Sequence, residues 1–364
     1  MNRNLMRYAA PAAAAVFVLA AAGCGASNEA GADGGSGSDL SGELSGAGAS
    51  SQEEAAAAWM KGFQTAHPDV TVNYDPVGSG AGREQFTAGG NIAFAGSDEY
   101  FPDDELAAAE KRCDSDVVEV PVYVSPIAVI FNVDGVDELN LSPKTLGAIF
   151  AGTITKWNDP AIVAENPDAG LPNAPITAVH RSDESGTTAN FTDYLDQASG
   201  GSWSHGLVET WPVKSGEAAE GTSGVVSAVK NGKGTIGYAD ASQAGDLGVA
   251  NIEVGKEFVS YSPEAAAATL DASKPVSGRS DTSMALDIDR TTTAKGVYPI
   301  VLVSYGIACS EYDSEEEASL VREYLGYVVS PEGQRAAAEQ AGSAPLSDQM
   351  ATDATAIVEN ISAK

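Results

Sequence analysis

The chain has 364 residues, of which 43% are hydrophobic, and this is enough for two domains of ordinary size. Its formal net charge of −31 repels nucleic acids and anionic head groups, so we exclude nucleic acid as a partner. The three histidines and three cysteines form no cluster with metal-ligand spacing, and we expect neither a metal nor a cofactor.

The N-terminus has the pattern of an export signal. Two arginines precede an uncharged apolar run at residues 9–22, which is too short for a comfortable membrane span. The "AAGC" that ends at Cys24 resembles a bacterial lipobox, although Ala stands where Leu is usual three positions before the Cys. We expect removal of residues 1–23 and lipidation of Cys24, which would hold the protein outside the cytoplasm on the cell membrane. The alternative is a simple secretory signal with a chance Cys.

Residues 24–45 are mostly Gly, Ser, Ala and acidic residues. Such a stretch has almost no large apolar side chains to bury, so we predict a flexible tether.

Beyond the tether, helical and strand patterns alternate. This alternation predicts an α/β architecture with a largely parallel sheet. Helices are predicted at residues 53–66, 82–89, 103–112, 143–151, 187–198, 223–231, 262–270, 314–329 and 331–341. Strands are predicted at residues 70–74, 92–95, 117–123, 126–132, 176–180, 235–238 and 298–304.

Three helix starts carry hydroxyl groups beside backbone N–H groups that lack helical partners. Ser50 and Ser51 stand three residues before two glutamates, which is a doubled capping-box pattern. Ser79 lies among glycines just before a short helix, and Ser185, Gly186 and Thr187 open a third. Each start carries the positive end of a helix dipole, so each is suited to bind an anion.

The stretch "HRSDESGTTANF" at residues 180–191 allows two interpretations. As a hydrolase loop it would use Ser185 as the nucleophile, but the G-x-S-x-G pattern is absent and His180 ends an apolar strand. As an anion cradle, the fork of Arg181 would bind two oxygens while Asp183 holds that fork in place. The anion cradle uses more of these residues.

Cys113 and Cys309 remain as a pair if Cys24 is lipidated. In an oxidising compartment their parity favours a disulfide, and the alternative is two buried free thiols.

The chain resembles the phosphate-binding proteins of bacterial high-affinity phosphate ABC transporters over roughly residues 42–342. The resemblance rests on "GAGAS", "NYDPVGSGAGREQF", "FAGSDEYF", "LSPKTLGAIFAGTITKWNDPAI", "VHRSDESGTTANFTDYL" and "GTIGY". It implies a two-lobed periplasmic-binding-protein-like fold of type II, with two mixed sheets flanked by helices and two crossovers at a hinge. We place the crossovers near residues 124–126 and 303–306. Lobe one is then 46–124 plus 305–364, and lobe two is 125–304.

The resemblance also implies a ligand set. One residue in it, Asp98, is a carboxylate that would repel an anion, unless the ligand carries a proton to donate, as phosphate does and sulfate at neutral pH does not. The alternative is that Asp98 caps a helix beginning near Glu99. The family usually has Thr-Phe-Pro where this chain has Ser50-Ser51-Gln52. The implied phosphate ligands are Ser50, Ser51, Ser79, Asp98, Arg181, Ser185, Gly186 and Thr187.

The implied function is capture of inorganic phosphate between the lobes and delivery to an ABC permease, by a monomer and without covalent chemistry. Three alternatives remain: a receptor for sulfate or molybdate, a secreted serine hydrolase or phosphatase, and an adhesin or scaffold with a degenerate site.

Overall fold

The computed structural model describes residues 40–89 and 91–364, so the predicted signal segment, Cys24 and most of the tether lie outside the described residues. The helices are α1 (Glu53–Ala66), α2 (Ser79–Thr87), α3 (Asp103–Cys113), α4 (Pro143–Phe150), α5 (Pro160–Glu165), α6 (Gly186–Ala198), α7 (Gly221–Asn231), α8 (Pro263–Asp271), α9 (Glu315–Val329), α10 (Pro331–Ala341) and α11 (Asp348–Val358). The main strands are β1 (Gly42–Gly48), β2 (Val70–Asp75), β3 (Phe94–Ser97), β4 (Val117–Asn132), β5 (Leu139–Leu141), β6 (Thr177–Arg181), β7 (Glu217–Ala219), β8 (Thr235–Asp240), β9 (Gly248–Val254), β10 (Glu257–Val259) and β13 (Val301–Cys309). Four two-residue strands complete the set: β11 (Lys274–Pro275), β12 (Leu286–Asp287), β14 (Glu311–Tyr312) and β15 (Ser362–Ala363).

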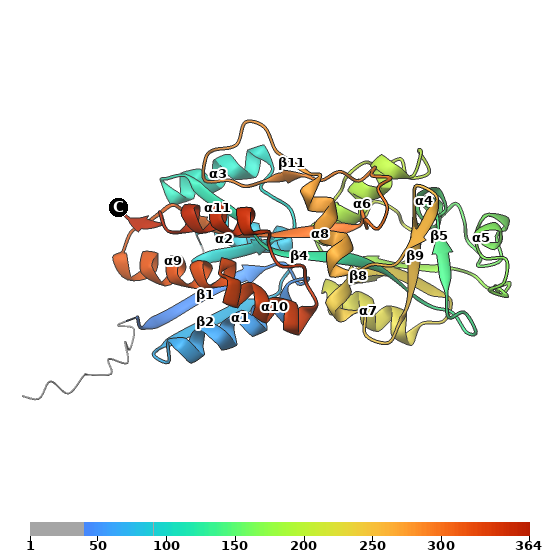
Figure 1. Cartoon of the computed structure of the whole chain (residues 1–364), viewed down its shortest axis with the longest axis horizontal. Helices are drawn as coiled ribbons and strands as arrows, with labels where there is room; N and C mark the ends of the chain where they lie inside the picture. The colour runs from blue at the N-terminus through green and yellow to red at the C-terminus, as the bar shows by residue number, and fades with distance from the viewer. Residues whose placement is uncertain (1–39, 90) are drawn as a thin grey trace, which may run out of the picture. The chain divides into compact units, whose positions relative to one another are not determined.

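The long strand β4 organises the sheet. Strands follow one another in the order β2-β1-β3-β13-β4-β8-β6-β7, and β9 also pairs with β4. The first part of β4 pairs with β13 as far as Pro126, and from Ile127 onward it pairs with β8. In Figure 1, β4 extends from the elements around β1 and α9 to those around β8 and α7. The pairing partner of β4 therefore changes beside residues 124–126, where a crossover was predicted. The lobe boundaries stay a prediction.

The predicted α/β class with mixed sheets flanked by helices is confirmed. The prediction of a largely parallel sheet is wrong, because β13 pairs antiparallel with β3 and β4, and β4 pairs antiparallel with β8 and β9. A second difference lies at β4. The sequence predicts two strands, 117–123 and 126–132, but the structure has one continuous strand. Antiparallel pairing with β13 covers Val124 to Pro126, and the Ile127 N–H donates to the Ile300 carbonyl at 2.7 Å. Hydrogen bonding across the expected gap joins the two predicted sheets into one network.

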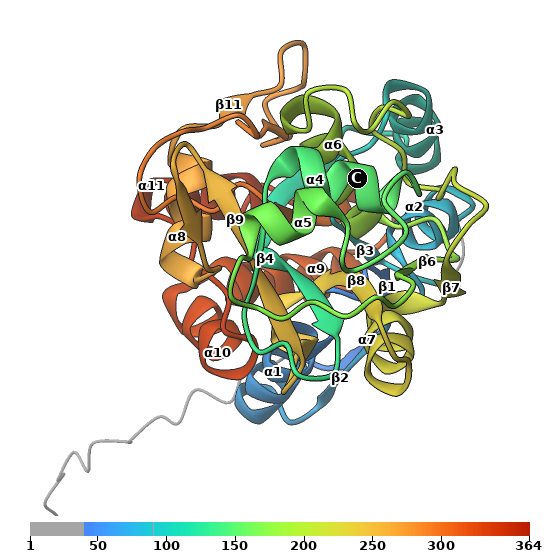
Figure 2. The same ribbon diagram turned by 90° about the vertical axis from the view of Figure 1, so that its right-hand side faces the viewer.

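Helices cover both faces of this sheet through buried aromatic side chains. Trp59 and Phe63 form the buried stripe of α1, and the Trp59 indole N–H donates to the Gly333 carbonyl at 2.9 Å, which ties α1 to α10. The view in Figure 2 shows α7 on one side of β8 and α4 with α6 on the other. On α6, Phe191 stacks on Tyr238 of β8 with 4.3 Å between ring centroids.

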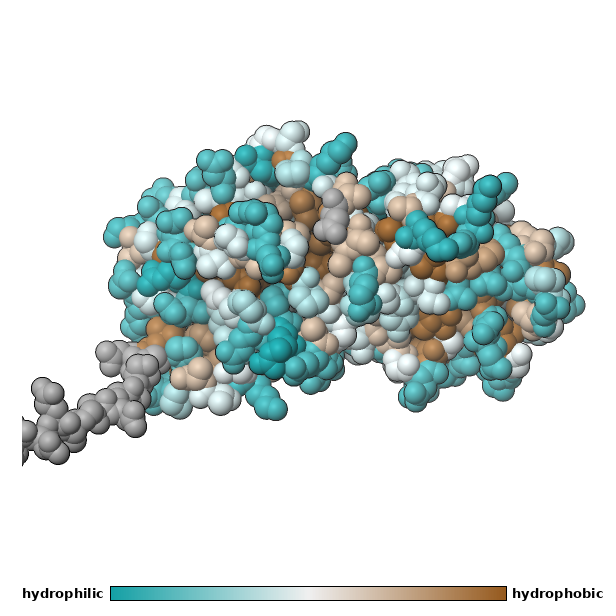
Figure 3. All heavy atoms as spheres, viewed as in Figure 1, coloured by the Kyte–Doolittle hydropathy of each residue, from teal (hydrophilic) through white to brown (hydrophobic). Residues whose placement is uncertain are grey.

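The surface agrees with the strongly acidic composition. Figure 3 shows hydrophilic residues over most of the face in view. Within residues 40–89 and 91–364, no helix is long and apolar enough to cross a membrane.

The tether prediction is wrong for residues 42–45. They belong to β1, which lies between β2 and β3 in the sheet. Two glycines of β1 just after the predicted tether are needed for packing, because a Cβ on Gly46 would lie 2.2 Å from the Phe94 ring. A Cβ on Gly48, whose φ is +151°, would lie 1.9 Å from the Gly96 carbonyl oxygen.

Most predicted helices are confirmed, with small shifts at their ends. α1 and α10 have the predicted bounds, and α4 begins at the predicted Pro143, with Ser142 as its cap. α2 begins at Ser79, three residues before the predicted start. No element was predicted at β1, α5, α11, β9 or any of the two- and three-residue strands. These elements are short, or their apolar residues follow no clear period.

The disulfide between Cys113 and Cys309 is confirmed, with 5.4 Å between the two Cα atoms. It joins the end of α3 to the end of β13 across 196 residues of sequence.

We expect the double substitution Cys113→Ser with Cys309→Ser to lower the free energy of unfolding by about 2–5 kcal/mol, because the bridge restricts a long loop in the unfolded chain. Urea unfolding measures this. Mass spectrometry of the native protein should show a gain of two hydrogens on reduction, and two alkylatable thiols without reductant would contradict the pairing.

Candidate functional site

The starts of α2 and α6 meet at the end of β3. The Asp98 N–H donates to Ser79 Oγ at 3.1 Å, which fixes the residue after β3 to the first residue of α2. A Cβ on Gly186, the first residue of α6, would lie 2.7 Å from Ser79 Oγ and 2.8 Å from Asp98 Cβ. A glycine is therefore required at this helix start, because any side chain would push the two segments apart.

Three hydroxyl groups surround the Asp98 carboxylate, which is 2% exposed. Oδ1 accepts from Ser51 Oγ at 2.6 Å and from Ser304 Oγ at 2.5 Å, while Oδ2 accepts from Thr187 Oγ1 at 2.8 Å. Burial raises the pKa of the Asp98 carboxyl, whereas the three hydrogen bonds and the charge of Arg181 act in the opposite direction. No helix begins near Glu99, since α3 starts at Asp103, so the alternative role of Asp98 as a helix cap is wrong.

The backbone of Asp98 is held by a second chain of polar groups. Asn190 on α6 donates to the Asp98 carbonyl at 2.6 Å and to the Gly186 carbonyl at 2.9 Å. Its own carbonyl oxygen accepts from Arg290 Nη2 at 2.5 Å, and Arg290 is also bonded to Asp193 at 2.9 Å. Asn190 thus fixes Asp98 to the first turn of α6.

Arg181 ends β6 and places its guanidinium next to α2. Its Nε donates to Asp183 Oδ1 at 2.8 Å, and its Nη2 contacts Asp183 Oδ2 in a two-point pair. A Cβ on Gly78 would lie 3.6 Å from Arg181 Nη2. Although burial raises the pKa of the Asp183 carboxyl, the hydrogen bonds and charge of Arg181 hold that pKa below its ordinary value. Asp183 also accepts from the Gly221 N–H at 3.1 Å.

Ser185 is the N-cap of α6. Its Oγ accepts from the Thr188 N–H at 3.1 Å, and its own N–H donates to the Glu209 carbonyl at 3.2 Å. His180 lies away from this hydroxyl, because its Nδ1 pairs with the Arg181 carbonyl at 3.0 Å and its ring stacks on Trp211. In this geometry Ser185 caps α6, and His180 is not placed to act as its catalytic base.

The capping-box prediction for Ser50 and Ser51 is wrong. The N-cap of α1 is Gln52, which makes no side-chain capping bond. Ser50 Oγ instead accepts from the Thr222 N–H and pairs with Thr222 Oγ1, both at 3.1 Å. Ser51 turns toward Asp98, as described above. The backbone enters α1 one residue later than a cap at Ser51 requires, and tertiary partners take the two hydroxyl groups.

The contacts therefore bring the predicted residues into one network. Sequence reasoning missed three members of it: Thr222, Asn190 and Ser304. Thr222 carries a recognisable signal, because Gly221 and Thr222 open α7 with the same glycine-hydroxyl pattern as the other helix starts. Asn190 sits one turn after Gly186, and the sequence around Ser304 reads only as a buried strand.

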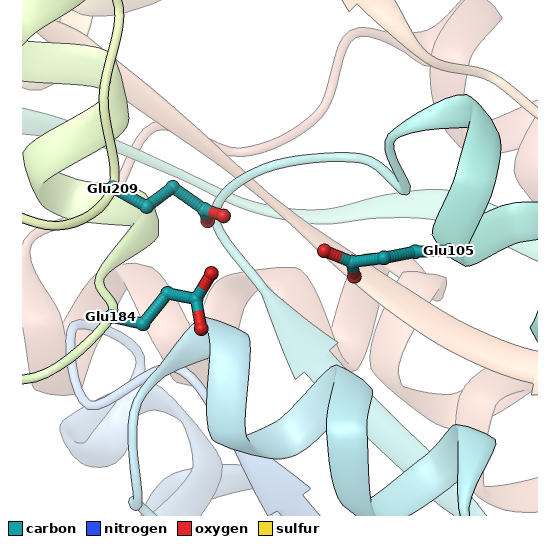
Figure 4. A group of neighbouring side chains, drawn as sticks. All are labelled: Glu105, Glu184 and Glu209. Atoms are coloured by element: carbon teal, nitrogen blue, oxygen red, sulfur yellow. The ribbon is translucent and has the colours of Figure 1, made fainter.

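An ion-pair cluster around the buried side chain of Arg83 lies beside the network. Arg83 on α2 is fully buried and donates to Glu209 at 2.6 and 3.0 Å and to Glu105 at 2.7 Å. Figure 4 shows Glu105, Glu184 and Glu209 extending toward one another from separate segments. Burial and the charge of Glu209 raise the pKa of the Glu184 carboxyl. Arg83 supplies a positive charge among the three carboxylates and joins α2 to the segment that follows α6.

Comparisons with known proteins agree with this architecture. Residues 30–332 match the PBP superfamily domain. Phosphate-binding protein PstS 3 of Mycobacterium leprae is 37% identical over 83% of this chain and 85% of its own, and PstS 2 of Mycobacterium tuberculosis is 36% identical over 96% of each. A solved structure of a high affinity periplasmic phosphate-binding protein bound with phosphate matches 86% of this chain and 93% of its own, with a TM-score of 0.70 and 22% identity.

Proposed function

Because the chain belongs to the PstS family of phosphate-binding proteins within the PBP superfamily, we propose that it binds inorganic phosphate and passes it to an ABC permease. The observation that carries the proposal is that Arg181 and Asp98 are close enough to interact electrostatically, while Arg181 is paired with Asp183. Two buried groups of opposite charge, each 2% exposed, belong to one network of helix starts. The protein is a binding protein and not an enzyme.

Arg181 and the helix starts supply the attraction for an anion. Asp183 accepts hydrogen bonds from Nε and from one N–H of Nη2 of Arg181, and so fixes the orientation of the guanidinium. The remaining N–H groups of Arg181 can donate to oxygen atoms of the anion. The first turn of α6 adds backbone N–H groups, that of Thr187 among them, at the positive end of the helix dipole, while the Thr187 hydroxyl donates to Asp98. We assign Ser50, Ser51, Ser79, Ser185 and Gly186 to the same ligand shell, in which Ser51 and Gly186 act through their backbone N–H groups.

Asp98 supplies selectivity. An ionised carboxylate accepts a hydrogen bond from a P–OH group of phosphate, whereas sulfate would present only another acceptor to it. Two desolvated acceptors that face each other without a proton are costly, so sulfate or molybdate is the weaker alternative. A serine hydrolase is weaker still, because Ser185 Oγ caps α6 and His180 is turned to Trp211.

The ligand would lie between the two predicted lobes, 46–124 with 305–364 and 125–304. Several contacts join residues on opposite sides of this division, among them Thr187 with Asp98, Ser50 with Thr222 and Arg83 with Glu209. An anion that contacts Arg181 and the segment of Asp98 together would stabilise the arrangement in which these pairs form.

We further propose that the protein acts outside the cytoplasm as a lipid-anchored monomer. The support is the export pattern at residues 1–23, the lipobox-like Cys24, and the disulfide, which needs an oxidising compartment. Permease subunits would be the protein partners.

Titration calorimetry combined with small-angle X-ray scattering tests the proposal. We expect one phosphate to bind per chain and the radius of gyration to fall on binding, because closure brings the lobes together. The control ligand is chloride at matched ionic strength, which should change neither quantity. Binding without any change in the radius would contradict closure, and hydrolysis of a chromogenic phosphate ester that Ser185→Ala abolishes would instead indicate an enzyme.

A further inference from the structure

The Asp98 carboxylate has a limited number of acceptor positions. Two carboxylate oxygens offer about four lone-pair directions in total. Oδ1 takes hydrogen bonds from Ser51 at 2.6 Å and from Ser304 at 2.5 Å, which fills both of its directions. Oδ2 takes one from Thr187 at 2.8 Å. One acceptor direction remains, and it belongs to the oxygen on the α6 side.

Ser304 lies beside an irregularity in the pairing of β13 with β4. β13 pairs with β4 residue by residue, but the register shifts between Ser304 and Tyr305. Ser304 lies opposite Tyr123, while Tyr305 lies opposite Pro121. The extra residue is therefore Val122 of β4, and a bulge of this kind increases the local twist of the strand that carries it. The Ser304 side chain, fully buried, reaches Asp98 Oδ1 from the strand beside β3.

We propose that Ser304 and the side chain of Ser51 are positioning residues for anion selectivity. They occupy Oδ1 of Asp98 and leave a single acceptor direction on Oδ2 for one P–OH group of the ligand. This inference rests on the proposed function. It adds Ser304, which touches no proposed ligand donor except through Asp98, and it gives the Ser51 hydroxyl a role separate from that of its backbone N–H.

The proposal predicts how selectivity depends on pH. Ser304, Ser51 and Thr187 each lower the pKa of the Asp98 carboxyl, against the raising effect of burial. Once protonated, Asp98 would donate to an anion oxygen, and sulfate would no longer meet an unpaired acceptor. Selectivity is therefore present above the pKa of Asp98 and is lost as the pH falls through it. Removing a hydroxyl raises that pKa and moves the loss to higher pH.

Other charged groups near Asp98 also influence the pH dependence of selectivity. Burial raises the pKa of Asp98 and the charge of Arg181 opposes this rise, while burial and then the charge of Asp98 raise the pKa of Tyr74. Burial and then the charge of Glu209 raise the pKa of Glu99 to about 8, so this neighbour also titrates. A control variant that leaves all of these groups in place is therefore needed. The other charged groups that line the adjoining hollow with Asp98 are Asp193, Asp287 and Arg290.

The test measures the selectivity ratio, defined as the sulfate dissociation constant divided by the phosphate dissociation constant, at about pH 5 and about pH 8. In Ser304→Ala we expect the ratio at the lower pH to fall by about tenfold relative to the unmodified protein, and by less at the higher pH. Ser51→Ala should show the same dependence and serves if Ser304→Ala does not fold. Ser125→Ala is the matched control, because Ser125 is equally buried on β4 and bonds to the Pro126 carbonyl.

A pH-dependent fall in both variants and none in Ser125→Ala would support the inference. Ratios that stay at the level of the unmodified protein, or that fall equally at both pH values, would overturn it while the proposed function stands. A ratio near one in the unmodified protein at about pH 8 would overturn the proposed selectivity itself and this inference with it.

Discussion

Arg181→Ala should weaken phosphate binding by about 100-fold or more. Two charge-assisted hydrogen bonds to the anion would be lost, and each is worth about 1.5–3 kcal/mol. The substitution also leaves Asp183 without its cation beside the bound anion. Titration calorimetry measures the affinity.

Two matched variants separate the site from a general loss of charge. Arg335→Ala removes an arginine whose side chain is 64% exposed on α10, and it should bind phosphate as the unmodified protein does. Arg181→Lys keeps the charge but not the planar fork, so its affinity should lie between those of the other two variants. An affinity of Arg181→Ala within about threefold of the unmodified protein would remove Arg181 from the ligand shell.

Asp98→Asn should lower the selectivity ratio, the sulfate dissociation constant divided by the phosphate dissociation constant, by about 100-fold or more. A site built around one hydrogen bond can reject the analogue that lacks the partner by about 10⁴–10⁵. The Asn amide can donate to a sulfate oxygen, so the repulsion that excludes sulfate disappears. Competition between the two anions gives the ratio.

The matched control for this substitution is Asp103→Asn, which removes an almost fully exposed carboxylate at the start of α3. We expect its selectivity to equal that of the unmodified protein. Should Asp98→Asn also keep the full selectivity, the carboxylate would not be the acceptor for the ligand proton.

The site could be predicted where its chemistry is local. Ser79 and the Ser185–Thr187 segment could be recognised from the sequence, because hydroxyl groups and glycines stand together at a helix start. Both lie in the network. Arg181 and Asp183, two residues apart at a strand end, pair as the spacing suggests. Gly221 and Thr222 carry the same pattern and could have been found by it. In each case a few consecutive residues determine both the backbone and the donor groups.

Other features depend on contacts between distant segments. Ser304 has no local signal, because its partner Asp98 is 206 residues away in sequence and follows the neighbouring strand β3. Ser50 and Ser51 have the sequence of a helix cap, yet Thr222 and Asp98 compete successfully for their hydroxyl groups. β1 has the composition of a tether and is nevertheless held between two strands. Tertiary partners override local preference in these places.

Net charge and anion binding are compatible in this protein. The chain carries −31, but at physiological ionic strength charges farther apart than about 8 Å are largely screened. The anion would instead respond to Arg181 and the N–H groups around it. The affinity should therefore depend on these local donors more than on the total charge.

The most direct test of the central claim is a competition titration of the unmodified protein at neutral pH. Phosphate should bind at one site per chain and keep its heat of binding in about a 1,000-fold excess of sulfate, because sulfate lacks the proton that Asp98 accepts. Displacement of phosphate by sulfate at comparable concentration, or no binding of phosphate at all, would contradict the account.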